Sequence, residues 1–265
     1  ASSHHADVTA RLKPHVGIID IKGEIADKQV SSAESFSEGL KAAYESKSMK
    51  ALVFRINSPG GSPVQADYMY TAAKYYREKY PDIKTYAVCV DMCASAAYYI
   101  AVAADEIYAA PASMVGSIGV IYNGFGFVDT LHKVGASRRL QTAGAHKAFL
   151  DPFSPEKPDD AVYLQRMLDL VHQQFIDVVK AGRGARLKIS ADTFSGLFWT
   201  GTQAKTQGLI DGFGNSESLA RDVIKIEEVV DYTAKENVMA LLSKNLGAEV
   251  AHQLPAALGL KPGLQ

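Results

Sequence analysis

Ser95 is the side chain of this chain best placed by its neighbours for nucleophilic chemistry. It follows strand-type residues and opens a run of small and apolar residues, SAAYYIA, so we expect it where a strand meets a helix. A helix N-terminus favours developing negative charge, and small neighbours leave room for a substrate backbone. The alternative is that Ser95 is a helix cap, a common role of serine at this position.

A pair of glycines forms a second segment with chemical potential. Gly60 and Gly61 lie in residues 57–62, NSPGGS, between a buried strand and a helix. Glycines let the backbone approach a ligand and turn its N–H groups outward, beside the positive end of the helix. Such a loop can stabilise an oxyanion, but it lacks the lysine of a nucleotide-binding loop. A tight turn that binds nothing is the alternative.

A nucleophilic serine needs a base, and no histidine stands with an aspartate in a recognisable triad pattern. His146 lies in an expected loop, and a triad built on it is one alternative. Its neighbour Lys147 is another candidate, because a lysine acts as a general base when desolvation lowers its pKa from about 10.4. Residues 141–152 contain small and apolar residues that can supply such a pocket. Lys147 can equally be a solvated surface residue.

Strand-like and helix-like periods alternate around these segments. Expected strands are 15–25, 51–56, 85–90, 106–109 and 137–142; expected helices are 32–44, 64–76, 95–103, 129–134 and 161–180. Short connections between them predict an α/β layered fold with parallel strands joined by right-handed crossover helices. We assign residues 1–12 to a flexible leader, 13–227 to one domain, and 228–265 to a C-terminal helix and tail.

Composition excludes several classes of protein. Hydrophobic residues make up 47% and charged residues 22% of the 265 residues, which is typical of a globular chain and not of a disordered one. With 28 Lys and Arg against 29 Asp and Glu, the net charge is -1 and no basic run is present, so we expect no nucleic-acid partner. Cys89 and Cys93 are too few for a disulfide scaffold or a zinc site.

Membrane attachment is not visible in the printed sequence. The longest apolar stretch, residues 94–104, is about half of the roughly 20 residues that a spanning helix needs. No signal peptide is recognisable. Since the chain begins with Ala1 instead of Met, we expect a processed or truncated product whose upstream anchor, if any, is missing.

Five ordered segments resemble the signal peptide peptidase A family, bacterial Ser/Lys peptidases related in fold to ClpP and crotonase. The resemblance spans residues 16–212 and fits the short, single-repeat members of that family. It implies a ClpP/crotonase-like fold. The segments are INSPGGS, CASAAYYIA, VGSIGV, TAGAHKAFLDPF and WTGTQAKTQGLID.

The resemblance also implies roles for individual residues. Ser95 matches the nucleophile and Lys147 the general base, while Ser117 matches the hydroxyl that orients the lysine amine. No metal or organic cofactor is implied. The backbone N–H groups that meet the oxyanion would come from Gly60, Gly61 and Ala96.

One departure affects the implied oxyanion site. The family usually has two glycines after the nucleophile, whereas this chain has Ala96 and Ala97. A Cβ at residue 96 is strained if the backbone there needs a positive φ, and it costs nothing if the backbone is helical.

By resemblance, the chain is a serine endopeptidase that degrades cleaved signal peptides and other unfolded hydrophobic polypeptides. The family implies a ring-shaped homo-oligomer at the bacterial inner membrane, facing the periplasm or the cell exterior. Two other functions stay open. One is a catalytically silent scaffold that binds peptides, and the other is a crotonase-type acyl-CoA enzyme, which would need carboxylates near the glycine loop that the sequence does not place there.

Overall fold

The computed structural model describes residues 11–235, and the predicted C-terminal helix lies outside them. Eight strands form one sheet in the order β6-β5-β3-β2-β1-β8, with β4 beside β3 and β7 beside β4. Every pair is parallel except β5 with β6, so the predicted α/β layered fold is confirmed. The strands are β1 (His15–Lys22), β2 (Met49–Ser58), β3 (Lys84–Ala94), β4 (Glu106–Ala109), β5 (Met114–Gly116), β6 (Phe198–Thr200), β7 (Gly212–Phe213) and β8 (Val229–Asp231).

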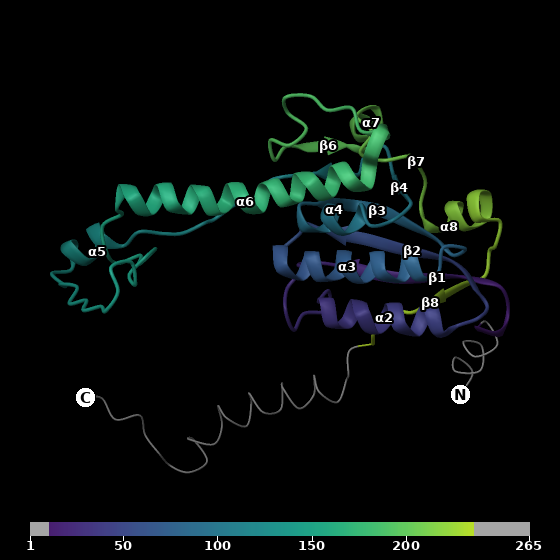
Figure 1. Ribbon diagram of the computed structural model, residues 1–265, viewed down its shortest axis with the longest axis horizontal. Helices are drawn as coiled ribbons and strands as arrows, with labels where there is room; N and C mark the ends of the chain where they lie inside the picture. Colours follow the sequence, from purple (N-terminus) through teal and green to yellow (C-terminus); the bar gives the residue numbers. More distant parts are fainter. Residues whose placement is uncertain (1–10, 236–265) are drawn as a thin grey trace, which may run out of the picture.

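The helices follow the strands as crossover connections (Figure 1). They are α2 (Ala33–Glu45), α3 (Pro63–Lys79), α4 (Ala96–Ala101), α5 (Val128–Lys133), α6 (Pro158–Arg183), α7 (Gly201–Thr206) and α8 (Ser216–Ser218), with a 3-10 turn η1 (Gly184–Arg186) and a π-helical turn η2 (Leu219–Ile224). Capping residues determine where helices begin, as α3 shows. The Ser62 hydroxyl accepts a hydrogen bond from the Gln65 N–H, and Pro63 fits the first turn of α3 because its φ is already helical.

Both faces of the central strands are buried, as expected for a mainly parallel sheet. Alternate residues of each strand point to opposite faces. On one face, α2, α3, α4 and part of α6 cover Ile19, Ile21, Leu52, Phe54 and Ile56. On the other, η2 contributes Leu219 and Ala220 against Val16, Ile18, Ala51, Val53 and Val88.

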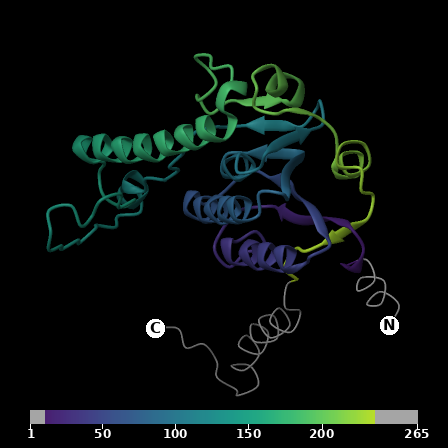
Figure 2. The same cartoon turned by 45° about the vertical axis from the view of Figure 1, so that its right-hand side comes forward.

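One end of the molecule projects away from this core. The 26 residues of α6 extend for about 39 Å, and only its C-terminal part lies over the sheet (Figure 1). Residues 128–157 gather at the far end of α6, where Figure 2 also shows them clear of the strands. The strand expected at 137–142 is wrong, because these residues form no strand and lie away from every strand in the described part of the chain.

The C-terminal boundary of the domain also differs from our assignment at residue 227. β8 pairs with β1, and Val230 is buried against the sheet. Beyond it, the Tyr232 hydroxyl lies 2.8 Å from His15 Nε2. The domain therefore includes β8, which is too short to give a clear period in the sequence.

A buried ion pair fastens the C-terminal end of α6 to the sheet. Arg183 is 1% exposed and donates to both carboxylate oxygens of Asp211, at 2.8 and 2.9 Å. Asp211 also accepts from the Ile107 N–H on β4 at 2.7 Å. Burial alone would raise the pKa of Asp211, but the hydrogen bonds from Arg183 and Ile107 outweigh it and hold that pKa below its usual value.

Candidate active site

Ser95 lies at the sharp turn between β3 and α4. Its backbone has φ 54° and ψ -125°, which is a costly conformation for a residue with a Cβ. Although Ser95 precedes the first residue of α4, its side chain makes no capping hydrogen bond, so the helix-cap alternative is wrong. Within the described residues the hydroxyl has no hydrogen-bond partner and is half-buried at the mouth of a pocket.

Ser117 lies beside Ser95 because the register of the sheet brings their strands together. Ala94 of β3 pairs with Gly116 of β5, and each serine is the next residue along its strand. The Ser95 N–H donates to the Gly116 carbonyl at 2.8 Å. Ser117 also has a positive φ, 51°, and its N–H donates to the Leu197 carbonyl at 2.9 Å. Two strained serines therefore occupy adjacent strand ends.

The glycine turn closes over Ser95 from β2. A Cβ at Gly60 would come within 2.8 Å of the Ser95 Cβ and 3.0 Å of the Ala96 nitrogen, so only glycine fits there. The Gly60 N–H is already used, since it donates to the Ser58 hydroxyl at 3.1 Å. Among the described residues the Gly61 N–H has no acceptor, which makes it the available donor of this turn.

Ala96 is the first residue of α4, and its φ is not positive. The departure from two glycines therefore introduces no strain at residue 96, and the unusual backbone falls on Ser95 itself. As the first N–H of a helix, the Ala96 N–H has no intrahelical acceptor. The N–H groups of Gly61 and Ala96 thus flank Ser95 as candidate donors to an oxyanion.

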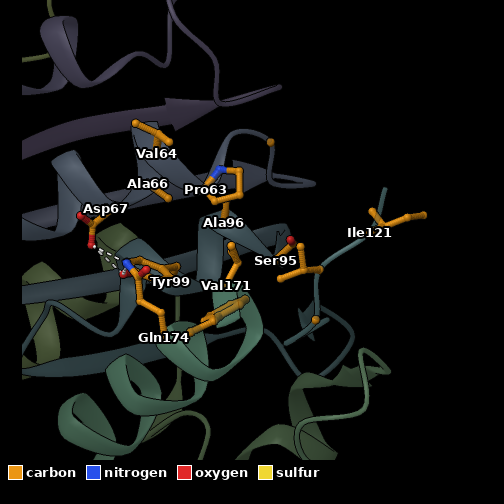
Figure 3. Close-up of a pocket in the computed structure, with 14 residues that line it drawn as sticks. Pro63, Val64, Ala66, Asp67, Ser95, Ala96, Tyr99, Ile121, Val171 and Gln174 are labelled. Carbon is orange, nitrogen blue, oxygen red and sulfur yellow. Dashed lines mark hydrogen bonds between the residues drawn. The ribbon is translucent and has the colours of Figure 1, made fainter. Parts of the chain in front are cut away.

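A pocket of about 280 Å³ opens directly beside Ser95. It lies between α3 and α6, over α4, and the segment that follows β5 forms a further side (Figure 3). Its walls are mainly apolar. They include Pro63, Val64, Ala66, Ile121, Val171 and Phe175.

Sequence reasoning missed a polar cluster in this pocket. The Tyr99 hydroxyl donates to Asp67 Oδ1 at 2.7 Å, and the Gln174 amide donates to the same oxygen at 3.2 Å and to the Tyr99 oxygen at 3.0 Å. Burial, helped by Asp67, raises the pKa of Tyr99, so that hydroxyl keeps its proton. The spacing of residues in the two expected helices could have indicated this cluster. Asp67 follows Pro63 by four residues and Tyr99 follows Ser95 by four, so each lies on the same helix face as a residue near the site.

Lys147 is not brought to Ser95 within the chain. It is exposed, in the projecting segment at the far end of α6. Its neighbour His146 lies 3.7 Å from Asp160 in the first turn of α6, measured from Nδ1 to Oδ1. Val171 of the pocket is eleven residues further along, about 16 Å on the helix axis. Ser95, Ser117, Gly60, Gly61 and Ala96 therefore form one cluster, and Lys147 lies outside it.

Other candidates lie outside the cluster as well. His146 is 78% exposed in the same projecting segment as Lys147, so it does not complete a triad with Ser95 within one chain. Cys89 and Cys93 are buried free thiols in β3. Over residues 11–235, no group of three or more His, Cys, Asp or Glu side chains is arranged to hold a metal ion.

The parallel sheet and its crossover helices define a Clp protease-like fold, and the family model described as Clp protease matches residues 1–116. A second family model, peptidase family S49, matches residues 77–230, which is more than half of the chain. The chain belongs to peptidase family S49.

Relatives with protease names align over most of the chain. A putative protease of Synechocystis, slr0021, is 34% identical over 75% of this chain and 69% of its own length. A putative signal peptide peptidase SppA of Enterococcus faecium is 28% identical over 89% of this chain and 69% of its own length.

A Brucella abortus protein named Na(+)/H(+) antiporter NhaA is 45% identical over 69% of this chain. The aligned part is 25% of that protein, so the chain spans about a quarter of the length of this relative. In residues 11–235 of the present chain, every helix is too short or too polar to cross a membrane.

Proposed function

We propose that this chain is a serine endopeptidase that cleaves unfolded hydrophobic polypeptides, including signal peptides released from secreted proteins. Ser95 is its nucleophile and Lys147 its general base. One observation carries the proposal: a Ser95 hydroxyl held on a strained turn lies between two backbone N–H groups and an apolar pocket, and within residues 11–235 neither the hydroxyl nor these N–H groups have a partner. Membership of peptidase family S49 and the name of the Enterococcus faecium relative support the substrate class.

In this mechanism Lys147 takes the proton of Ser95 as the hydroxyl attacks a peptide carbonyl. The N–H groups of Gly61 and Ala96 stabilise the tetrahedral oxyanion, and the Ser117 hydroxyl oxygen accepts a hydrogen bond from the lysine amine and so orients it. The lysine then protonates the leaving amine, and water hydrolyses the acyl-enzyme. No cofactor takes part in these steps.

The separation of Ser95 from Lys147 makes a second copy part of this proposal. The segment that carries Lys147 projects beyond the core, so it can reach the Ser95 cluster of a neighbouring copy. Such a contact joins two different surfaces of the chain. Contacts of this kind continue from copy to copy, and they close into a ring when the rotation allows it.

Exposed apolar side chains on the projecting part support a contact with another copy. Phe125 is 73% exposed and Val134 is 71% exposed, which is unusual for large apolar residues that gather in one region. Others in or beside the projecting residues are Phe127, Leu140, Leu150, Phe153, Val162 and Tyr163. Burying them between copies would stabilise a ring-shaped homo-oligomer. We place that assembly at the bacterial inner membrane, facing the periplasm or the cell exterior, with anchoring through a segment outside this sequence.

Two measurements test the proposal. A fluorophosphonate probe should label the protein at Ser95 and should not label a Ser95→Ala variant. For the base, Ser95→Ala and Lys147→Ala variants should each fail to cleave denatured casein when expressed alone, and co-expression should restore activity because one copy keeps Ser95 and its neighbour keeps Lys147. Full activity of Lys147→Ala alone would remove the lysine from the mechanism.

The same measurements separate the competing functions. A silent peptide-binding scaffold would not react with the fluorophosphonate. An acyl-CoA enzyme needs both an acid and a base near the oxyanion donors, whereas the described residues that line this pocket include one carboxylate, Asp67. Retention on immobilised CoA, without peptide cleavage, would favour that enzyme class instead.

A further inference from the structure

We infer that the pocket beside Ser95 selects a long, unbranched, cationic side chain, lysine or arginine, on the residue whose carbonyl Ser95 attacks, and that Asp67 is the residue that determines this specificity. The inference rests on the proposed peptidase function and goes beyond it, because an apolar pocket alone would predict leucine or phenylalanine there.

The position of the pocket fixes which substrate residue it receives. Its lining includes Ser95 itself and Gly61 and Ala96, whose N–H groups are the candidate oxyanion donors. A carbonyl held by these groups places its own Cα at the pocket mouth. The side chain on that Cα is therefore the one that enters.

The shape of the pocket suits a long side chain. In Figure 3, Ser95 lies at one end, and Asp67, Tyr99 and Gln174 meet at the other. Tyr99 of α4 lies four residues after Ser95, which precedes the helix, and four helical residues rise about 6 Å along the axis. The extended side chains of lysine and arginine suit a pocket of this length better than the shorter leucine side chain does.

The hydrogen bonds of the cluster leave two acceptor atoms without a donor among the described residues. Both contacts to Asp67 are made to Oδ1. Within the described residues, Asp67 Oδ2 has no donor, and neither does the Gln174 carbonyl oxygen, since Gln174 uses its amide nitrogen for both of its bonds. A ligand group that completes this cluster must therefore donate hydrogen bonds.

Charge favours a cationic donor over a neutral one. None of the lining residues within the described part of the chain is Lys, Arg or His, so no cation there balances the Asp67 carboxylate. The Tyr99 hydroxyl keeps its proton and holds the carboxylate in place without neutralising it. An ammonium or guanidinium group at the end of an apolar stem would meet Asp67 while its methylene groups pack on Val171 and Phe175.

A matched set of peptides tests the inference. Quenched fluorescent peptides that differ at one residue, carrying Lys, Arg, Met, Leu or Glu before the scissile bond, are compared by kcat/KM, and mass spectrometry locates the cleaved bond. We expect Lys and Arg to exceed Met and Leu about tenfold or more, with Glu lowest.

Variants then assign the preference to the carboxylate. Asp67→Asn keeps the shape and the acceptor for Tyr99 but removes the charge, so we expect kcat/KM for the Lys peptide to fall about 10- to 100-fold while the Met peptide changes by less than about threefold. Glu78→Gln is the control, because Glu78 is also on α3 but is 74% exposed and outside the pocket. It should change neither peptide.

The outcomes separate this inference from the proposed function. Cleavage after Leu or Met in preference to Lys, or an equal fall for Lys and Met peptides in Asp67→Asn, would overturn the role of Asp67 and leave the peptidase intact. Fluorophosphonate labelling of Ser95 with no cleavage of any peptide in the set would also overturn the specificity. Absence of both labelling and cleavage would overturn the proposed function, and the specificity with it.

Discussion

The two parts of the proposed dyad occupy contrasting regions of the molecule. Ser95 lies over the core, where the buried residues of β3 and α4 fix its backbone in an unfavourable conformation. Lys147 lies in a projecting segment, residues 128–157, whose side chains are mostly exposed. The nucleophile is thus positioned by the folding of one chain, while the base awaits a contact that one chain does not make.

Because of this difference, we expect mutations in the two regions to have different effects. Changes around Ser95 should alter the chemistry or the fold of a single copy. Changes around Lys147 should leave the single copy folded and act through the contact between copies. Activity, unfolding and association should therefore respond differently to mutations in the two regions.

Replacing Ser95 by alanine should lower kcat for a denatured protein substrate by at least about a thousandfold, because the nucleophile is lost. The thermal unfolding midpoint should stay close to that of the original chain, since the hydroxyl has no hydrogen-bond partner in the described residues. A large fall in that midpoint would mean that the hydroxyl has a structural role.

Removing Arg183 should unfold the region that holds α6 to the sheet. Arg183→Met removes the buried partner of the Asp211 carboxylate, while Arg186 remains 3.0 Å from Asp211 Oδ1. We therefore expect a loss of stability at or below the roughly 3–5 kcal/mol of a buried charge left without any partner. Urea unfolding at pH 7 measures the effect. The control is Arg221→Met, whose pair with Asp222 is exposed on both sides, so its removal should leave the urea midpoint almost unchanged.

The same pair predicts the response of stability to acid. The pKa of Asp211 in the folded chain lies below its ordinary value of 3.8. Its contribution is therefore complete above that value and is lost as the pH falls through the lower folded pKa. Urea unfolding over decreasing pH should show this loss, and the loss should be smaller in Arg183→Met. An identical acid dependence in both proteins would contradict it.

Closing the space over Ser95 should affect activity more than folding. In Gly60→Ala, the new Cβ would displace Ser95 or the Ala96 N–H, and we expect kcat to fall about 100-fold. The control is Gly23→Ala. Gly23 also has a positive φ, 70°, but nothing lies within 4 Å of its added Cβ, so we expect a loss of about 1 kcal/mol in stability and unchanged kcat.

The smallest effect on folding should come from the projecting region. Phe125→Ser removes a side chain that is 73% exposed, so the free energy of unfolding of a single copy should change by less than about 0.5 kcal/mol. Association measured by sedimentation should weaken, and activity should become more dependent on protein concentration. Unchanged association would place the contact between copies elsewhere.

The sequence predicted the core elements well because their periods are set by burial. β1, α2, β2, α3 and β4 all appear near their expected limits. The short strand β8 was missed, and residues 137–142 were wrongly predicted to be a strand. Both segments are too short for the pattern of apolar residues to show whether they pair with another strand. Tertiary contacts decide such segments.

The order of the motifs in the sequence identified candidate site residues, but it did not predict how far apart they lie in the folded chain. The turn at Gly60 and Gly61 and the serine at Ser95 could be placed together because both follow parallel strands that pair directly. The spacing between Ser95 and Lys147 carries no such constraint, because a long projecting helix intervenes. Asp67 was missed because its partners, Tyr99 and Gln174, come from two other helices.

Ser95 and Ser117 both adopt backbone conformations that glycine would adopt more easily. Selection for folding alone would therefore favour glycine at both positions, with a gain of about 1 kcal/mol or more each. Engineering that seeks a more heat-resistant protein by relieving these two residues would remove the hydroxyls as well, so thermal stability and turnover should trade against each other at these two adjacent strand ends.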